Sequence, residues 1–200
     1  MTTGGQTPDQ APEPRRASVQ YPGGLAARYR WTGSGGIAAL VSVSEAGGTL
    51  TDHGPIVAAD PDRLCRAELR VEGPSGTWTA RFASPIHDEP RGVFLDTAGL
   101  LVVKYGFLVY GMDARTGALR WHHASRTPVI AVLGSSRLPH VVAQGEIATI
   151  ALDAAGETVW RAAHADVITE AEIVGGRLVL ATWGGLHLVL DPATGRSLDG

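Results

Sequence analysis

Residues 111–121 read GMDARTGALRW, and two related phrases follow in the same half of the chain. These phrases are ALDAAGETVW at residues 151–160 and VLDPATGRSLD at residues 189–199. The aspartates at the third position of each phrase are 40 and 38 residues apart. A repeat of this length, built from short apolar runs joined by turn residues, is typical of stacked four-stranded β-sheets. The repeat therefore predicts an all-β fold made of similar units.

Each phrase has the residues of a tight strand connection. The aspartate can accept hydrogen bonds from the backbone N–H groups that follow it, and Gly117 can take the positive φ of a bulged hairpin. Trp121 and Trp160 are expected on an outer strand, with the ring against the neighbouring sheet and the indole N–H donated to a carbonyl. We therefore expect these tryptophans to fasten one sheet to the next.

From about residue 25 onward, short aliphatic and β-branched runs alternate with Gly, Pro, Asp and Ser. This alternation predicts hairpins at residues 176–190, 99–110 and 141–150. Residues 56–69 come closest to a helical period, although a proline interrupts them. Residues 1 to about 24 contain four prolines and no periodic pattern, so we expect a flexible tail before a domain at 25–200.

The number of repeats predicts a small β-propeller of about four four-stranded blades. The blades are expected to end near five positions: Trp31, Trp78, Trp121, Trp160 and Asp199. The last phrase ends on Asp199 where a tryptophan is expected, so we hypothesise that residues 27–31 complete the last blade and close the ring. The alternative is an incomplete ring finished by another chain, which would make the protein a homo-oligomer.

The pattern Asp113-x-x-Thr116-Gly117-x-x-x-Trp121 resembles the tryptophan-docking turn of the pyrroloquinoline-quinone-type (PQQ-like) β-propeller repeat. The resemblance covers about residues 95–200 and implies structural docking turns in a ring of usually seven or eight blades. A quinone enzyme of this family would have carboxylate and amide ligands for calcium and often a vicinal disulfide. The chain has one cysteine, and only the docking turns match the family, so we expect no cofactor.

Composition excludes several classes of function. Hydrophobic residues make up 44% of the chain and the net charge is -3, which argues against disorder and against nucleic-acid binding. The longest apolar runs are too short to span a membrane, and the N-terminus lacks the apolar stretch of a secretory signal. We expect a cytoplasmic protein that binds neither nucleic acid nor membrane.

The densest cluster of titratable side chains is the loop at residues 84–90, which contains His87, Asp88 and Glu89. Together with Asp52 and His53 from another loop, these side chains could form a metal or acid–base site, because imidazole and carboxylate groups bind metals and transfer protons. A short charged loop between prolines is more often simply solvated.

Other candidate residues have a structural interpretation. His122 and His123 are adjacent on an expected strand and should point to opposite faces, while His187 should be a hydrogen-bonded core residue. Cys65 lies between two arginines, which could activate its thiol, but packing is the simpler interpretation. The glycine-rich segment 33–36 lacks the residues of a phosphate loop. We therefore assign no catalytic, cofactor-binding or metal-binding residue.

These observations favour a non-catalytic binding or scaffold module that presents its loops or central funnel to a protein partner. The alternative is a hydrolase or lyase that uses His53, His87 and Asp88 in the propeller channel. The sequence does not identify the partner.

Overall fold

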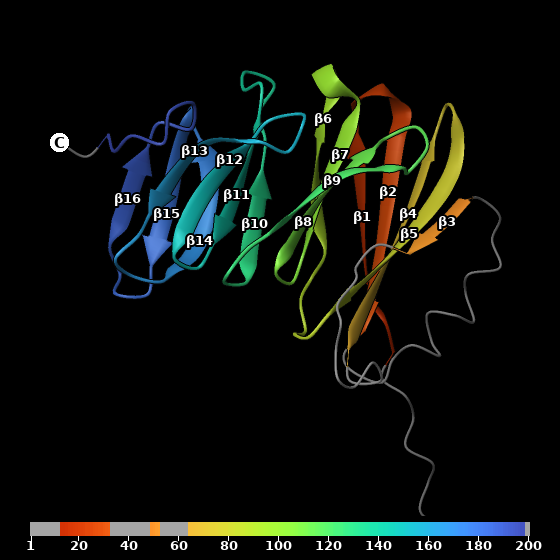
Figure 1. Ribbon diagram of the computed structural model, residues 1–200, viewed down its shortest axis with the longest axis horizontal. Helices are drawn as coiled ribbons and strands as arrows, with labels where there is room; N and C mark the ends of the chain where they lie inside the picture. The colour runs from red at the N-terminus through yellow and green to blue at the C-terminus, as the bar shows by residue number, and fades with distance from the viewer. Residues whose placement is uncertain (1–12, 33–48, 53–63, 199–200) are drawn as a thin grey trace, which may run out of the picture.

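The computed structural model describes residues 13–32, 49–52 and 64–198, with the backbone alone for 49–52. Figure 1 shows four β-sheets standing side by side along the long axis of the molecule, with the N-terminal sheet at the right and the C-terminal sheet at the left. Within these described residues, no helix has the length and apolar character needed to cross a lipid bilayer.

Sheet 1 contains five strands, and sheets 2, 3 and 4 contain four, four and three. The strands of sheet 1, in spatial order, are β1 (Arg15–Tyr21), β2 (Leu25–Thr32), β4 (Cys65–Gly73), β5 (Gly76–Ser84) and β3 (Thr49–Asp52). All neighbours in this sheet are antiparallel except β3, which pairs in parallel with β5. A short 3-10 turn, η1 (Pro22–Gly24), joins β1 to β2.

Sheets 2 and 3 are antiparallel meanders in sequence order. Sheet 2 consists of β6 (Arg91–Leu95), β7 (Leu100–Tyr105), β8 (Leu108–Asp113) and β9 (Leu119–Ala124), with the 3-10 turn η3 (Asp96–Ala98) between β6 and β7. Sheet 3 consists of β10 (Val129–Leu133), β11 (Val141–Gly145), β12 (Ala148–Leu152) and β13 (Thr158–Ala163). Both have the strand order of a propeller blade.

Sheet 4 contains the beginning of a fourth strand. Its three strands are β14 (Ile168–Val174), β15 (Arg177–Thr182) and β16 (His187–Leu190). Beyond β16, Ser197 forms a bridge with Leu190, and the Leu198 N–H donates to the Val189 carbonyl at 2.8 Å. The chain therefore starts the expected outer strand at this point.

The structure confirms the all-β prediction and the three hairpins, which are β7–β8, β11–β12 and β15–β16. It corrects one other expectation. Residues 15–24, expected to belong to a flexible tail, form β1 and η1, because β1 pairs along its whole length with β2. The described part of the segment with a weak helical period, residues 64–69, enters strand β4, whose alternating side chains suit a sheet with one buried face.

The N-terminal strand does not complete the last blade in this structure. Residues 27–31 lie in β2, and both edges of β2 are occupied, one by β1 and the other by β4. Sheets 1 and 4 lie at opposite ends of the row (Figure 1). The four blades therefore form a row in the described part of the chain, and closure of the ring by residues 27–31 is not detected there.

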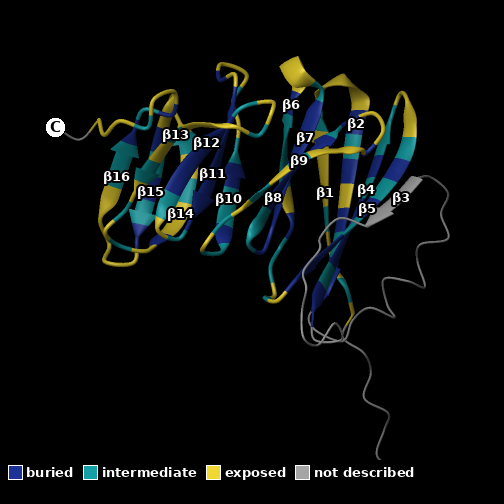
Figure 2. Ribbon diagram, in the orientation of Figure 1, coloured by how far each residue is buried: buried dark blue, intermediate teal, exposed yellow. Residues whose placement is uncertain are grey.

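The hydrophobic core lies in three layers, one between each pair of neighbouring sheets. Sheet 2 is covered on both faces, so every residue of β7 is buried, and Figure 2 shows this inner part of the row in the colour of buried residues. Sheet 1 is covered on one face by sheet 2, and β4 alternates apolar residues with Arg66, Glu68, Arg70 and Glu72. The place of a sheet in the row thus explains whether its strands are continuously apolar or alternating.

Three tryptophans join consecutive sheets through one repeated hydrogen bond. The indole N–H of Trp78 donates to the carbonyl of Ala114 at 2.9 Å, from sheet 1 to sheet 2. Trp121 donates in the same way to Ala154 at 3.0 Å, and Trp160 to Pro192 at 3.2 Å. Each acceptor directly follows the aspartate of a repeated phrase. The predicted fastening of sheet to sheet is confirmed, and we call these phrases the docking turns.

The aspartate of each docking turn closes the turn as predicted. Asp113 accepts hydrogen bonds from the backbone N–H groups of Arg115 and Thr116 at 3.1 and 3.0 Å. Hydrogen bonding by Arg120 is the main reason why the pKa of the Asp113 carboxyl is lowered, and the bonds from Thr116 lower it further. Asp153 and Asp191 accept the corresponding backbone bonds in the other two turns.

The glycine of each docking turn is required for two reasons. Gly117 has a φ of 73°, which an L side chain rarely adopts, and a Cβ there would be 2.6 Å from the Trp78 ring. Gly156 repeats both features against Trp121, and Gly195 contacts Trp160 in the same way. The turn therefore forms a socket for the tryptophan of the preceding sheet.

Trp31 does not have the expected role. It lies in β2, buried against sheet 2, and its indole nitrogen has no hydrogen-bond partner among the described residues. Trp78, on β5, the fourth strand of sheet 1 in spatial order, makes the docking contact of this sheet instead.

We predict that Gly117→Ala destabilises the protein by about 3 kcal/mol, because the new Cβ meets both an unfavourable φ and the Trp78 ring. Gly176→Ala is the matched control, since Gly176 has a φ of 79° but no atom within 4 Å of an added Cβ. The control should lose only about 1 kcal/mol. Urea unfolding followed by tryptophan fluorescence measures both losses, and equal losses would contradict the socket.

Candidate functional site

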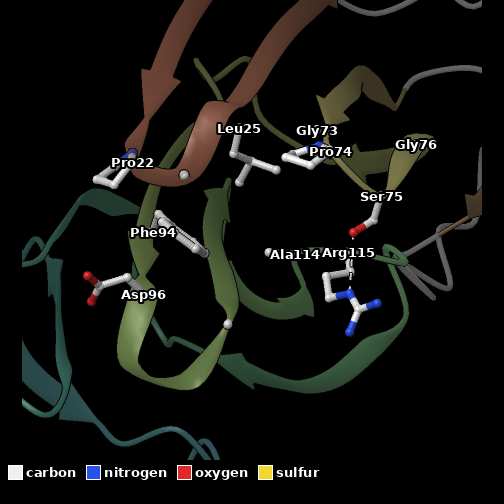
Figure 3. Close-up of a pocket in the computed structure, with 12 residues that line it drawn as sticks. Pro22, Leu25, Gly73, Pro74, Ser75, Gly76, Phe94, Asp96, Ala114 and Arg115 are labelled. Atoms are coloured by element: carbon white, nitrogen blue, oxygen red, sulfur yellow. Dashed lines mark hydrogen bonds between the residues drawn. The ribbon is translucent and has the colours of Figure 1, made fainter.

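The candidate site lies between sheets 1 and 2. It is at the end of the sheets where the docking turns lie, which is uppermost in Figure 1. It is an open pocket of about 490 Å³. Its walls come from η1 and the β4–β5 turn in sheet 1, and from β6, η3 and the first docking turn in sheet 2 (Figure 3). We call it the seam pocket; its lining residues are Pro22, Gly23, Leu25, Gly73, Pro74, Ser75, Gly76, Phe94, Asp96, Gly99, Ala114 and Arg115.

The position of Ala114 in the pocket wall follows from the docking contact. Its carbonyl accepts the Trp78 indole N–H at 2.9 Å, and its own N–H donates to the Gly99 carbonyl at 2.9 Å. On the rim, the Arg115 Nε donates to the Ser75 hydroxyl at 3.4 Å and so connects the two sheets. The contacts that join sheets 1 and 2 thus also shape the pocket.

The pocket is mainly apolar, with one charge of each sign. Leu25, Phe94 and Ala114 line it together with two prolines, whereas Asp96 and Arg115 are exposed and lie on opposite sides of it (Figure 3). The Asp96 carboxylate accepts a hydrogen bond from the Thr97 N–H at 2.8 Å. This combination suits a ligand that is apolar in the middle and polar at its ends.

A second pocket of about 270 Å³ adjoins the seam pocket and shares Pro22, Phe94 and Asp96 with it. It extends toward β10–β11 and includes Ser135 of the connecting loop. Close to it, the Tyr21 hydroxyl donates to the Gly92 carbonyl at 2.9 Å, which gives sheets 1 and 2 another contact. The two pockets together offer an elongated surface.

Of the proposed His–carboxylate site, the structure describes the side chains of His87, Asp88 and Glu89. His87 is exposed, and it lies in the loop between β5 and β6, at the opposite end of the sheets from the seam pocket. His53 lies outside the described residues, and the side chain of Asp52 is not described. Across the described ranges, no group of three or more His, Cys, Asp or Glu residues could hold a metal ion.

Asp88 has a structural position instead. Its carboxylate accepts hydrogen bonds from the Lys104 ammonium group and the Gly106 N–H, both at 2.6 Å. The Lys104 side chain is only 4% exposed, and burial lowers its pKa while Asp88 opposes that effect. In sheet 4, the Asp166 carboxylate accepts a hydrogen bond from the Gly184 N–H at 2.9 Å. Gly184 lies in the turn of the β15–β16 hairpin, as Gly106 lies in the turn of the β7–β8 hairpin. We therefore interpret Asp88 as a support for the β7–β8 hairpin.

The remaining histidines and Cys65 are also placed by the fold. His122 is exposed and His123 half-buried on alternating positions of β9, as expected. His187 is exposed, so its expected core position is wrong: the register of β15 and β16 turns Leu188 and Leu190 inward. Cys65 is buried in β4, which agrees with packing, and the glycine-rich segment 33–36 lies outside the described residues.

Two histidines that the sequence reasoning passed over make specific contacts. His140 is buried, and its Nε2 lies 2.9 Å from the Pro192 carbonyl that also accepts from Trp160. His164 lies 2.7 Å from the Thr149 hydroxyl, and burial lowers its pKa. Both contacts support sheet 3 and its junction with sheet 4.

Comparison of the sequence with protein-family models and with curated proteins finds no match. Several solved structures are similar in fold. Dihydro-heme d1 dehydrogenase NirN in complex with DHE aligns with a TM-score of 0.53 and 15% identity, over 70% of this chain and 34% of NirN. The computationally designed Ika8 protein aligns with a TM-score of 0.52 and 13% identity, over 90% of this chain and 59% of Ika8.

BamB from Moraxella catarrhalis aligns with a TM-score of 0.50 and 17% identity, over 90% of this chain and 56% of BamB. The chain therefore spans between about one third and three fifths of the length of these structures. NirN and BamB are β-propeller proteins. The comparisons agree with the all-β sheet arrangement, and the fold is that of a small β-propeller.

We predict that Asp88→Ala destabilises the protein by about 3 kcal/mol, because the substitution leaves the buried Lys104 charge without its partner. His87→Ala should leave the free energy of unfolding almost unchanged, since His87 is exposed. Asp166→Ala removes the related backbone hydrogen bond but leaves no buried charge without a partner. It should therefore lower the free energy of unfolding less than Asp88→Ala does. Thermal unfolding of the three variants gives the order, and an unchanged melting temperature for Asp88→Ala would refute the structural interpretation.

Proposed function

We propose that this chain is a PQQ-like β-propeller that acts as a non-catalytic binding module for a partner protein. β-Propellers often serve as protein-interaction scaffolds. The PQQ-like assignment rests on the three docking turns, each of which places a glycine against a tryptophan ring and a carbonyl against its indole N–H. In the family that the sequence resembles, these turns are structural, so they support the family and no particular chemistry.

The seam pocket is the observation that carries the proposal. Turns from two sheets form it, its walls are apolar, and its two charges stand at the rim. The fold fixes it through the Trp78–Ala114 bond, so the pocket exists before a partner arrives, and little ordering is needed on binding. A preformed apolar surface with polar edges is typical of a recognition site.

We expect the purified chain, immobilised through a C-terminal tag, to recover one protein in stoichiometric amount from a lysate of its own organism. The complex should then form again from the two purified proteins, with a one-to-one stoichiometry in isothermal titration calorimetry. A photo-cross-linking residue at Thr97, which is exposed beside Asp96 and does not line the pocket, should give a discrete adduct with that partner. The same residue at Arg177, in the distant sheet 4, is the matched control.

Recovery of no stoichiometric protein, or failure of the purified pair to form a complex, would refute the binding module. An adduct at Arg177 and none at Thr97 would retain the module and move its site to sheet 4. Both results are measured with the full chain, so they do not depend on the stability of an isolated part.

A further inference from the structure

Arg115 distinguishes the first docking turn from the other two. The residue two positions after the aspartate is Arg115 in the first turn, Ala155 in the second and Ala193 in the third. All three backbone N–H groups donate to the aspartate carboxylate, at 3.1, 2.8 and 2.8 Å. The turn therefore forms equally well with alanine, and the arginine side chain is not needed for its local fold.

The Arg115 guanidinium group has N–H donors that the described residues do not use. Its Nε donates to the Ser75 hydroxyl, and its two terminal nitrogens make no further hydrogen bond or ion pair with the described residues. The side chain is exposed at the rim of the seam pocket (Figure 3). A planar guanidinium with free N–H groups is best matched by a carboxylate.

Asp96 offers the opposite charge across the pocket. One carboxylate oxygen accepts the Thr97 N–H, and the other has no partner among the residues that the structure describes. Between the two charges lie Leu25, Phe94 and Ala114 (Figure 3). A matching ligand therefore has a negative group, an apolar group and a positive group in succession.

The backbone of the pocket wall is accessible. A Cβ built on Gly23, Gly76 or Gly99 would have no atom within 4 Å, so no side chain of the described residues covers these positions. The adjoining pocket lengthens the surface beyond the size of a single side chain. These features suit an extended peptide, whose main chain can approach the glycines while its side chains reach the apolar wall and both charges.

We infer that the seam pocket binds an extended segment of the partner protein in which an aliphatic or prolyl residue is flanked by one acidic and one basic residue. The acidic side chain pairs with Arg115, and the basic side chain pairs with Asp96. This inference rests on the proposed function and adds the chemistry of the partner to it.

The test uses a library of random twelve-residue peptides displayed on phage and selected on the immobilised full chain. The wild-type chain should enrich peptides that contain an acidic, an aliphatic or prolyl, and a basic residue. Arg115→Glu should replace the acidic residue of this pattern with a basic one. Asp96→Lys should replace the basic residue of the pattern with an acidic one. Each variant therefore changes a different residue of the peptide pattern.

Fluorescence anisotropy then measures the affinity of individual variants for the selected peptide that the wild-type chain binds most tightly. Arg115→Glu should weaken binding by about tenfold, because the variant replaces an attractive charge pair at the rim with a repulsive one. Ser75→Trp should abolish binding, because a bulky side chain at the rim fills the pocket, whereas Ser75→Ala should keep most of it. Circular dichroism and melting temperature check that every variant is folded.

Three results would overturn the inference. The first is that the wild type and both charge variants select the same pattern, and the second is that the library shows no enrichment. The third is that folded Ser75→Trp binds the peptide as tightly as the wild type does. The proposed function fails separately, when no partner forms a complex with the wild-type chain. A partner that still binds Ser75→Trp as tightly as the wild type would leave the binding module in place and exclude the seam pocket as its site.

Discussion

The fold depends on one contact that is made three times: an indole N–H of one sheet donates to the carbonyl that follows an aspartate in the next sheet. The contact needs several local features at once. The aspartate closes the turn, the glycine gives the ring a flat surface at positive φ, and the tryptophan lies on the fourth strand of its sheet. Because these features lie close together in each repeat, the junction is encoded by short phrases of sequence, although it joins different sheets.

The sequence was informative wherever the determinant was local. The docking role of Trp121 and Trp160 followed from the aspartate and glycine before them, and the hairpins followed from apolar runs around a turn. Strand β1 was missed because its residues are mostly exposed and show no apolar alternation. Trp31 was assigned to a docking position because spacing alone does not tell which strand of a sheet a tryptophan occupies.

The candidate site was harder to predict because its parts come from segments that are far apart in the sequence. Pro22, Pro74, Phe94 and Ala114 meet only after sheets 1 and 2 have packed together. Asp88 illustrates a related difficulty: a loop with histidine and carboxylates has the same composition whether its carboxylate is free or holds a buried lysine. One signal was present in the sequence, since Arg115 departs from the alanine of the two other repeats.

The linear order of the sheets determines how the molecule loses its structure. The main contacts join each sheet to its immediate neighbours, so the cooperativity of the domain is that of a short chain of coupled units. Among the described residues, sheet 4 has one neighbouring sheet, three strands and the apolar cluster with the fewest buried residues, and its backbone amides should exchange with solvent by local opening first. Sheet 2 is held from both sides and should be the most protected part of the domain, so the seam pocket has one wall on its most rigid unit.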